Sequence, residues 1–440
     1  MCGIVISSKY VEQNFCNIIQ KRGPDATNYI EYNGFHFIHY LLHVTGSKTL
    51  QPIIDNNVVY IFNGEIYNYK TLLETAESDI FAIIDVYKKY GSDFVKYLDG
   101  EFTIVVMDFN SNKLFISSDI FKTKPLFYSV NNESVIIASY ESTCKKIIDQ
   151  SYNSIEPNEL LIFDLNNRTL IEKKTIHTFD LNQHKTDYND FNNALENAIL
   201  KRYPEHSMPV ISLSSGLDSG TIAKCLFKHN KPSYFYSFIK GENPSIINQR
   251  VQILGENATI LQLTNEDKTN YLNYLNDNCE PFNWDWTYNP RVNRVENGFK
   301  MGSMLGKSKI LSVAKEKDSN VNVYFSGIGA DEVMAHNCFY SCGYGNVDKF
   351  PEKLNDVFPW TNFFKGSMEN YINGDEYVGG SYSYETRYPY CDTQLIQEFL
   401  WLIPDLKNTY NGIIYKPPLL HYLDKVNGFP VCRQKKGFDP

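Results

Sequence analysis

Leu213-Ser214-Ser215-Gly216-Leu217-Asp218-Ser219 decides the fold of the second half of the chain. The apolar run Val210–Leu213 leads into it and a helical pattern begins at about Ser219, so it is predicted to join a buried strand to a helix. Small residues let the backbone fold closely around a phosphate, with N–H groups and the helix N-terminus facing the anion. The simpler alternative is a glycine turn before a capped helix. The spacing favours a pyrophosphate-binding loop over the GxxxxGK[ST] loop.

Strands and helices alternate after this loop. Further strands are predicted at Tyr234–Ile239 and Val321–Phe325, which indicates an α/β domain with a parallel, doubly wound sheet. The first half is β-rich, and one helix is predicted at Asp79–Tyr90. Its predicted strands are Gly3–Ser7, Tyr29–Leu42, Val58–Phe62, Phe102–Phe109, Lys113–Ser118 and Val135–Ala138. The residues of Lys174–Asp190 are polar and weakly patterned, which is typical of a boundary between domains. We therefore predict two domains, 1–180 and 181–440.

Composition excludes several classes of protein. The 440 residues carry a net charge of −9 without basic blocks, which argues against nucleic-acid binding and against attachment to an anionic membrane surface. No apolar run approaches the length of a membrane span, and no signal peptide is recognised. Nine scattered cysteines, an odd number, are typical of a reduced cytoplasmic protein. The close pair Cys338 and Cys342 is a weak candidate for a metal site.

Residues near the start of the chain suggest amide hydrolysis. Removal of Met1 would leave the Cys2 thiol beside a free α-amine, which can accept its proton. An Asn side-chain amide and a Gly N–H, as at Asn63-Gly64, are suitable donors to the oxyanion of a tetrahedral intermediate. The same dipeptide is otherwise common in hairpin turns. Asp79 either caps its helix or holds the ammonium group of an amino acid.

The order of these motifs resembles the glutamine-hydrolysing asparagine synthetase family over nearly the whole chain. The stretches that carry the resemblance are MCGI at the start, RGPD at 22–25, FNGEIYNY at 62–69 and LDGEF at 98–102. It implies an α+β first domain, an αββα sandwich with an N-terminal nucleophile. It also implies that Cys2 is the nucleophile, that Asn63 and Gly64 form the oxyanion hole, and that Glu65 and Asp79 bind the glutamine ammonium group.

The second domain carries the matching synthetase motifs. The implied ATP-binding residues are Leu213, Ser214, Ser215, Gly216, Asp218 and Ser219 in the loop, with Ser326 and Gly327 in the segment SGIGADE. The resemblance assigns a metal to Asp218 and Asp331, in keeping with oxygen ligation of Mg²⁺. Glu385, in ETRYPYCD, is expected on the acceptor side. Lys435, in RQKKGF, is expected to neutralise charge during adenylation or amide formation.

Two residues depart from the family pattern. Leu41 stands where the family has an Arg that grips the glutamine carboxylate, a strong pairing, and His43 or Lys48 are candidate substitutes. Ile328 stands where asparagine-forming members have Glu, and the chain stops at Pro440, soon after the Lys motif. An apolar residue there leaves a charged acceptor short of buried partners. We therefore expect aspartate to be a poor acceptor, with Glu385 the first alternative source of a carboxylate.

These observations predict a glutamine- and ATP-dependent ligase. Cys2 frees ammonia from glutamine, and the second domain activates a carboxylic acid as an acyl-adenylate with Mg·ATP, releasing pyrophosphate. Two alternatives stay open: a lactam- or macrolactam-forming cyclase, against which Cys2 argues, and a non-catalytic paralogue that binds glutamine or nucleotide. The expected partners are glutamine, ATP and a carboxylic acid, with no nucleic acid and no membrane. The oligomeric state is open, a homodimer included.

Overall fold

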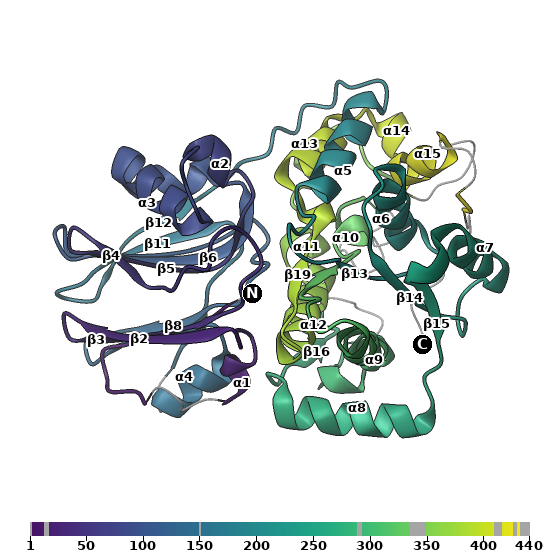
Figure 1. Ribbon diagram of the computed structural model, residues 1–440. Coiled ribbons are helices and arrows are strands. Elements are labelled where there is room, and N and C mark those ends of the chain that lie inside the picture. The colour runs from purple at the N-terminus through teal and green to yellow at the C-terminus, as the bar shows by residue number, and fades with distance from the viewer. Residues whose placement is uncertain are drawn as a thin grey trace. The chain divides into compact units, whose positions relative to one another are not determined.

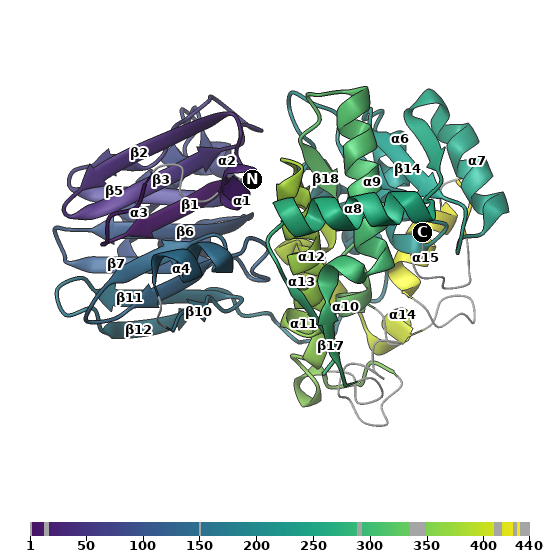
Figure 2. The same cartoon turned by 90° about the horizontal axis from the view of Figure 1, so that it is seen from below.

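The computed structural model describes residues 2–12, 17–148, 151–287, 293–334, 349–408, 416–425 and 429–431. Its contacts divide the chain into two compact units. Unit 1 consists of Met1–Thr178, Asp277–Pro281 and Gly379–Glu385, and unit 2 of Phe179–Asn276, Phe282–Val378 and Thr386–Pro440. Figures 1 and 2 show both units from two sides.

Unit 1 is a sandwich of two antiparallel sheets. One sheet has the order β10-β8-β9-β1-β3-β2 and the other β12-β11-β7-β6-β5-β4. The strands of the first are β1 (Gly3–Ser7), β2 (Ala26–Tyr32), β3 (Phe35–Leu41), β8 (Phe127–Val130), β9 (Val135–Ala138) and β10 (Asn153–Ser154). Those of the second are β4 (Ile53–Asp55), β5 (Val58–Ile66), β6 (Gly100–Asp108), β7 (Lys113–Ser118), β11 (Glu159–Asp164) and β12 (Leu170–Thr175).

Strand alternation explains the layers of this sandwich. Along β5, Val59 and Ile61 point into the core between the sheets, where they join residues such as Ile4 of β1. Tyr60 and Phe62 point to the opposite face, which packs on α3 (Asp79–Tyr90). Helix α2 (Tyr69–Leu72) lies on the same outer face, and α1 (Asn17–Gln20) and α4 (Glu141–Ile147) lie outside the other sheet (Figure 1). The predicted αββα sandwich is confirmed.

One predicted strand is in fact two. The run Tyr29–Leu42 contains the dipeptide Asn33-Gly34, whose φ angles of 48° and 76° form a tight turn between β2 and β3. Asn-Gly accepts these angles readily, so the chain folds back into a hairpin. The prediction of one continuous strand was therefore wrong.

Unit 2 is built on a five-stranded sheet of order β15-β14-β13-β18-β19, as the predicted α/β class requires. Its strands are β13 (Val210–Ser212), β14 (Tyr234–Phe238), β15 (Ala258–Leu261), β18 (Val323–Phe325) and β19 (Glu385–Arg387). Strand β13 runs parallel to β14 on one side and to β18 on the other. In such sheets ligands bind where the strand order reverses, beyond the carboxyl ends of the strands. Here that point lies between β13 and β18.

Helices surround this sheet (Figures 1 and 2). They are α5 (Asn189–Leu200), α6 (Leu217–Lys228), α7 (Pro244–Leu254), α8 (Asn265–Asn278), α9 (Gly302–Lys317), α10 (Ala330–Met334), α11 (Thr361–Phe364), α12 (Ser367–Ser381), α13 (Thr393–Trp401), α14 (Pro404–Asn408) and α15 (Pro417–Lys425). A small hairpin pairs β16 (Asn283–Asp285) with β17 (Val295–Asn297).

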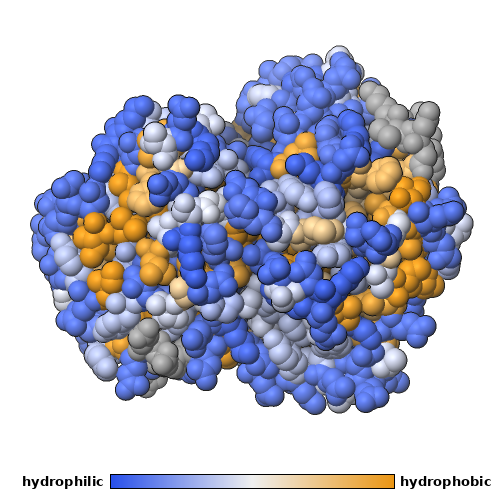
Figure 3. Space-filling view, in the orientation of Figure 1, coloured by the Kyte–Doolittle hydropathy of each residue, from blue (hydrophilic) through white to orange (hydrophobic). Residues whose placement is uncertain are grey.

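The face drawn in Figure 3 is mainly hydrophilic, with apolar residues interspersed. None of the helices that the structure describes combines the length and the apolar composition needed to cross a bilayer.

Gly64 offers a test of this packing. Its φ is +137°, and a Cβ atom there would come within 1.9 Å of the Glu101 carbonyl oxygen on β6. We expect Gly64→Ala to lower the free energy of unfolding by about 3 kcal/mol, because backbone strain and steric overlap add. The control is Gly34→Ala, which also has a positive φ but open space around it, and should cost about 1 kcal/mol. Equal losses in denaturant unfolding would contradict this account.

Candidate functional site

The first site forms where β1 begins beside β5. The backbone N of Cys2 donates a hydrogen bond of 2.8 Å to Asn63 Oδ1, and Cys2 Sγ lies 3.9 Å from the Leu42 carbonyl oxygen. Burial raises the pKa of the Cys2 thiol above its usual value, and a neighbouring amino-terminal charge opposes this shift. A thiol in this environment needs a base to take its proton, and an α-amine at Cys2 would be adjacent to it.

Arg22 fixes the cysteine from the other side. Its Nε donates to the Cys2 carbonyl oxygen at 2.9 Å, and Nη1 donates to the Tyr140 hydroxyl at 3.0 Å. The guanidinium is fully buried and lies 4.9 Å from the centre of the Tyr140 ring. The RGPD motif therefore supplies an anchor for the cysteine backbone, a role that the sequence did not reveal.

The candidate oxyanion donors are Asn63 and Gly64. They lie within β5, opposite Thr103 and Phe102 of β6, which excludes the hairpin-turn alternative. With Oδ1 bound to Cys2, the amide nitrogen Nδ2 of Asn63 is buried and has no partner among the described residues. An unpaired buried donor is costly unless a ligand satisfies it. An oxyanion beside the thiol would do so.

Two carboxylates lie at the end of the same strand. Glu65 is buried on β5, and Asp79 begins α3 and accepts a 3.2 Å hydrogen bond from the backbone N of Ile66. Burial raises the pKa of Asp79 to about 7, although hydrogen bonds from Ile66 and Ser78 oppose the shift. A cation would stabilise the ionised form of this carboxylate.

Leu41 occupies the position at which the family has its carboxylate-binding arginine. Leu41 is buried at the end of β3. Of the two candidate substitutes, His43 donates its backbone N to Asp25 Oδ2 at 2.7 Å, and Lys48 Nζ donates to the Asp25 carbonyl oxygen at 2.9 Å. Both residues therefore lie at the RGPD turn, and a role for either of them in binding the glutamine carboxylate stays a prediction.

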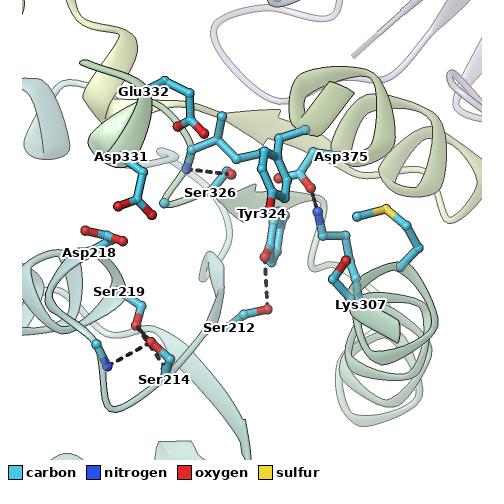
Figure 4. A pocket seen from close by; sticks show the side chains of 16 residues that line it. Ser212, Ser214, Asp218, Ser219, Lys307, Tyr324, Ser326, Asp331, Glu332 and Asp375 are labelled. Carbon is cyan, nitrogen blue, oxygen red and sulfur yellow. Dashed lines mark hydrogen bonds and ion pairs between the residues drawn. The ribbon is translucent and has the colours of Figure 1, made fainter. Parts of the chain in front are cut away.

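The second site is a cavity of about 280 Å³ at the switch point of the unit 2 sheet. It lies between the loop after β13 and the loop after β18, with α9 and α12 forming the far wall (Figure 4). Its lining residues are Ser212, Ser214, Gly216, Asp218, Ser219, Ser303, Met304, Lys307, Tyr324, Ser326, Gly327, Ile328, Asp331, Glu332, Tyr371 and Asp375. The predicted loop and the SGIGADE segment thus meet in one cavity.

Buried charges hold the loop from behind. Glu242 accepts hydrogen bonds from the backbone N and the hydroxyl of Ser215. Arg250 donates to the carbonyl oxygens of Ser214 and Gly216. Carbonyl oxygens bound to Arg250 face away from the cavity, so they do not repel an anion there. Neither partner could be identified from the sequence, because both residues lie on or before α7, far along the chain from the loop.

A buried lysine joins the two predicted metal ligands. Lys416 Nζ pairs with Asp218 Oδ1 and lies 3.0 Å from Asp331 Oδ1. The lysine is fully buried, whereas the aspartate side chains are 26% and 29% exposed toward the cavity. No cluster of three or more metal-ligating side chains occurs among the described residues. Two converging carboxylates still fit Mg²⁺, which commonly takes one or two from protein and the rest from phosphate and water.

The acidic segment after β18 is braced internally. The backbone N of Ile328 donates to Ser326 Oγ at 3.2 Å. The side chain of Ile328, which has no polar group, lines the cavity. Glu332 accepts from the backbone N of Gly329 and from Ser367 Oγ. Its carboxylate therefore supports the loop.

The far wall carries a charged pair that sequence reasoning missed. Lys307 of α9 and Asp375 of α12 form an ion pair, and both side chains are less than a tenth exposed. Lys307 Nζ also lies 5.0 Å from the centre of the Tyr324 ring, whose hydroxyl donates to Ser212 Oγ. Burial lowers the pKa of Lys307, and the charge of Glu376 opposes the shift. The lysine therefore depends on nearby carboxylates to stay charged.

Three predicted residues that the structure describes do not line this cavity. Leu213 donates its backbone N to the Tyr236 carbonyl oxygen, and Ser215 faces Glu242, so both support the loop without lining the cavity. Glu385 belongs to unit 1, where its charge raises the pKa of both Cys2 and Asp79. Lys435 lies outside the described residues.

Comparison with known proteins agrees with this geometry. Residues 1–181 match the glutamine amidotransferase domain family. A probable glutamine-hydrolysing asparagine synthetase of Acanthamoeba polyphaga mimivirus is 25% identical over 386 residues, which covers 76% of this chain and 67% of that protein. The glutamine-hydrolysing asparagine synthetase of Mus musculus is 23% identical over 447 residues, covering 90% of this chain and 75% of its own. Among solved structures, the glutamine phosphoribosylpyrophosphate amidotransferase of B. subtilis covers 48% of this chain and 60% of its own, at 14% identity and a TM-score of 0.32.

Unit 1, with its buried cysteine beside an asparagine amide, belongs to the class of glutamine amidotransferase domains, and an α/β domain follows it. More particularly, most of the chain is similar to glutamine-hydrolysing asparagine synthetases, as its ordered motifs indicated.

Lys416 provides a test of the unit 2 site. Lys416→Met would leave two carboxylates facing each other without their shared cation. Because both are about a quarter exposed, we expect a loss of about 1–3 kcal/mol in metal-free buffer. Added Mg²⁺ should raise the unfolding temperature of this variant more than that of the wild type. The control, Lys416→Met combined with Asp331→Asn, removes the repulsion and should recover stability without metal. An unchanged unfolding temperature for the single variant would rule out this view of the pair.

Proposed function

We propose that the protein transfers ammonia from glutamine to a carboxylic acid, which it first activates with ATP as an acyl-adenylate. The observation that carries the proposal is the presence in one chain of two built sites. One has a buried thiol beside an unpaired amide donor, and the other has a phosphate loop facing paired carboxylates. Glutamine hydrolysis alone would not require the second site, and ATP binding alone would not require the first.

In unit 1, Cys2 attacks the side-chain amide carbon of glutamine. The α-amine accepts the thiol proton, and Asn63 Nδ2 with the Gly64 N–H binds the developing oxyanion. Glu65 and Asp79 bind the ammonium group of the substrate. The α-ammonium group returns the proton to the amide nitrogen, ammonia leaves, and water then releases glutamate and the free thiol from the thioester.

In unit 2, the loop binds the phosphates of ATP. Ser214 and Ser219 offer hydroxyl groups, which now hydrogen-bond to each other at 2.8 Å, and the N-terminus of α6 faces the cavity. Asp218 and Asp331 would hold Mg²⁺, which would balance the phosphate charge. The acceptor carboxylate attacks the α-phosphate, pyrophosphate leaves, and ammonia then displaces AMP. Lys416 is a second cation at the phosphate end, and Lys435 keeps its predicted role.

The direct test offers a panel of carboxylic acids to purified protein with Mg·ATP and glutamine. Pyrophosphate release that depends on both the acid and the loop is expected, and Asp218→Asn or Asp331→Asn should abolish it. Release of ADP and orthophosphate would refute adenylation. The panel includes aspartate. Ile328 leads to the expectation that aspartate is a poor acceptor, but the cavity wall also presents the side chains of Lys307 and Asp375.

Separation of the two sites gives a further prediction. Cys2→Ala should abolish glutamine hydrolysis while amide formation from ammonium chloride continues at the wild-type rate. The reason is that the thiol belongs to unit 1 and the loop to unit 2. Glutamate release and pyrophosphate release are measured on the same preparation. Loss of both activities in a variant with normal unfolding would show that the sites are not separable.

Glutamine binding should depend on pH. With a pKa of about 7, Asp79 is mostly protonated at pH 6 and mostly ionised at pH 8. Only the ionised form pairs with the ammonium group, so affinity should rise about tenfold from pH 6 to pH 8. Calorimetry on the Cys2→Ala variant measures this without turnover. In Asp79→Asn the affinity should be weaker at pH 8 and nearly independent of pH. A flat profile in the parent would assign the binding to other groups.

A further inference from the structure

Amide formation requires a group that takes a proton. When ammonia adds to an acyl-adenylate, the nitrogen of the tetrahedral intermediate carries an extra proton, and it must lose that proton for a neutral amide to form. The SGIGADE segment presents Ile328 to the cavity, and its side chain cannot accept a proton. If the proposed function holds, the proton acceptor must lie elsewhere on the cavity wall.

Four carboxylates line the cavity: Asp218, Asp331, Glu332 and Asp375. The first two face the phosphate loop and share Lys416. Both oxygens of Glu332 are hydrogen-bonded within the protein, to Gly329 and Ser367. Asp375 differs, because it lies on the far wall, away from the phosphate end (Figure 4).

The surroundings of Asp375 suit a fixed carboxylate. Lys307 pairs with its Oδ1, and the contacts of the described residues leave Oδ2 for a ligand. The side chain of Asp375 is only 3% exposed although it lines the cavity, so water competes little for it. Lys307 is in turn placed over the Tyr324 ring, which is tied to Ser212 at the end of β13. The pair is thus joined to the central strand of the site.

We propose that Asp375 is the proton acceptor for amide formation and that Lys307 is its positioning residue. Ammonia forms a C–N bond to the acyl carbon, and its proton passes to Asp375 Oδ2. The C–O bond to AMP then breaks, AMP leaves with the electron pair, and Asp375 returns the proton to solvent. The carboxylate that the family places at the position of Ile328 is thereby supplied from helix α12.

The test separates adenylation from amidation in the full-length protein. Asp375→Asn is expected to keep acid-dependent ATP–pyrophosphate exchange within about threefold of wild type, while amide formed from ammonium chloride falls by about a hundredfold. Hydroxylamine is less basic than ammonia, so its adduct loses a proton more readily and hydroxamate formation should fall far less. Asp375→Glu should recover part of the amidation. Lys307→Met should also lower the amount of amide formed per AMP released.

The matched control is Lys309→Met on the same helix. Lys309 pairs with Asp267 and does not line the cavity, so exchange and amidation should both stay at wild-type rates. Normal amidation by Asp375→Asn would overturn the inference and leave the proposed function intact. Equal loss of exchange and amidation would also overturn it, in favour of a structural ion pair. Absence of exchange in the wild type with every acid would reject the proposed function, and the inference with it.

Discussion

The hydrogen bond from the Cys2 backbone N to Asn63 Oδ1 is the contact on which unit 1 depends. It joins the first residue before β1, in one sheet, to β5, in the other. Because this bond is only 2.8 Å long, the two sheets must keep a fixed position relative to each other. The apolar layer of Ile4, Ile61 and their neighbours maintains that position. The same bond uses Oδ1 of the Asn63 amide and leaves Nδ2 without a partner among the described residues. The packing of the core therefore also places the amide that is proposed to bind the oxyanion.

Unit 2 meets a different constraint, the balance of buried charge. The phosphate site proposed for the loop after β13 needs N–H groups and cations on its inner side, yet the same loop also has carbonyl oxygens. Arg250 donates hydrogen bonds to the carbonyl oxygens of Ser214 and Gly216, and Glu242 accepts a hydrogen bond from the backbone N of Ser215 between them. On the inner side, Lys416 compensates Asp218 and Asp331. Each charge has a partner, so the cavity can stay open without leaving an ion buried and unpaired.

The sequence predicted the local features well and the remote ones poorly. The helix Asp79–Tyr90 has the bounds expected from its apolar periodicity, and the stretch 213–219 joins a strand to a helix as predicted, although that helix begins at Leu217, earlier than expected. The turn at Asn33-Gly34 was missed because β-branched and aromatic residues continue on both sides of it. The sandwich followed only from the family resemblance. Lys416, Lys307 and Asp375 could not be found, because each meets its partner across a long stretch of chain and neither periodicity nor a motif marks such pairs.

The two departures from the family pattern do not mark a decayed site. A cavity without a ligand would gain stability if apolar residues replaced its buried ion pairs, since such replacements are often neutral or stabilising. Here the far wall keeps a buried ion pair, Lys307 with Asp375, beside Met304 and Ile328. In unit 1, Asn63 keeps a buried donor that has no partner among the described residues. Groups that weaken the protein are retained most readily where a ligand uses them, and these groups belong to the two sites where glutamine and the adenylate are proposed to react.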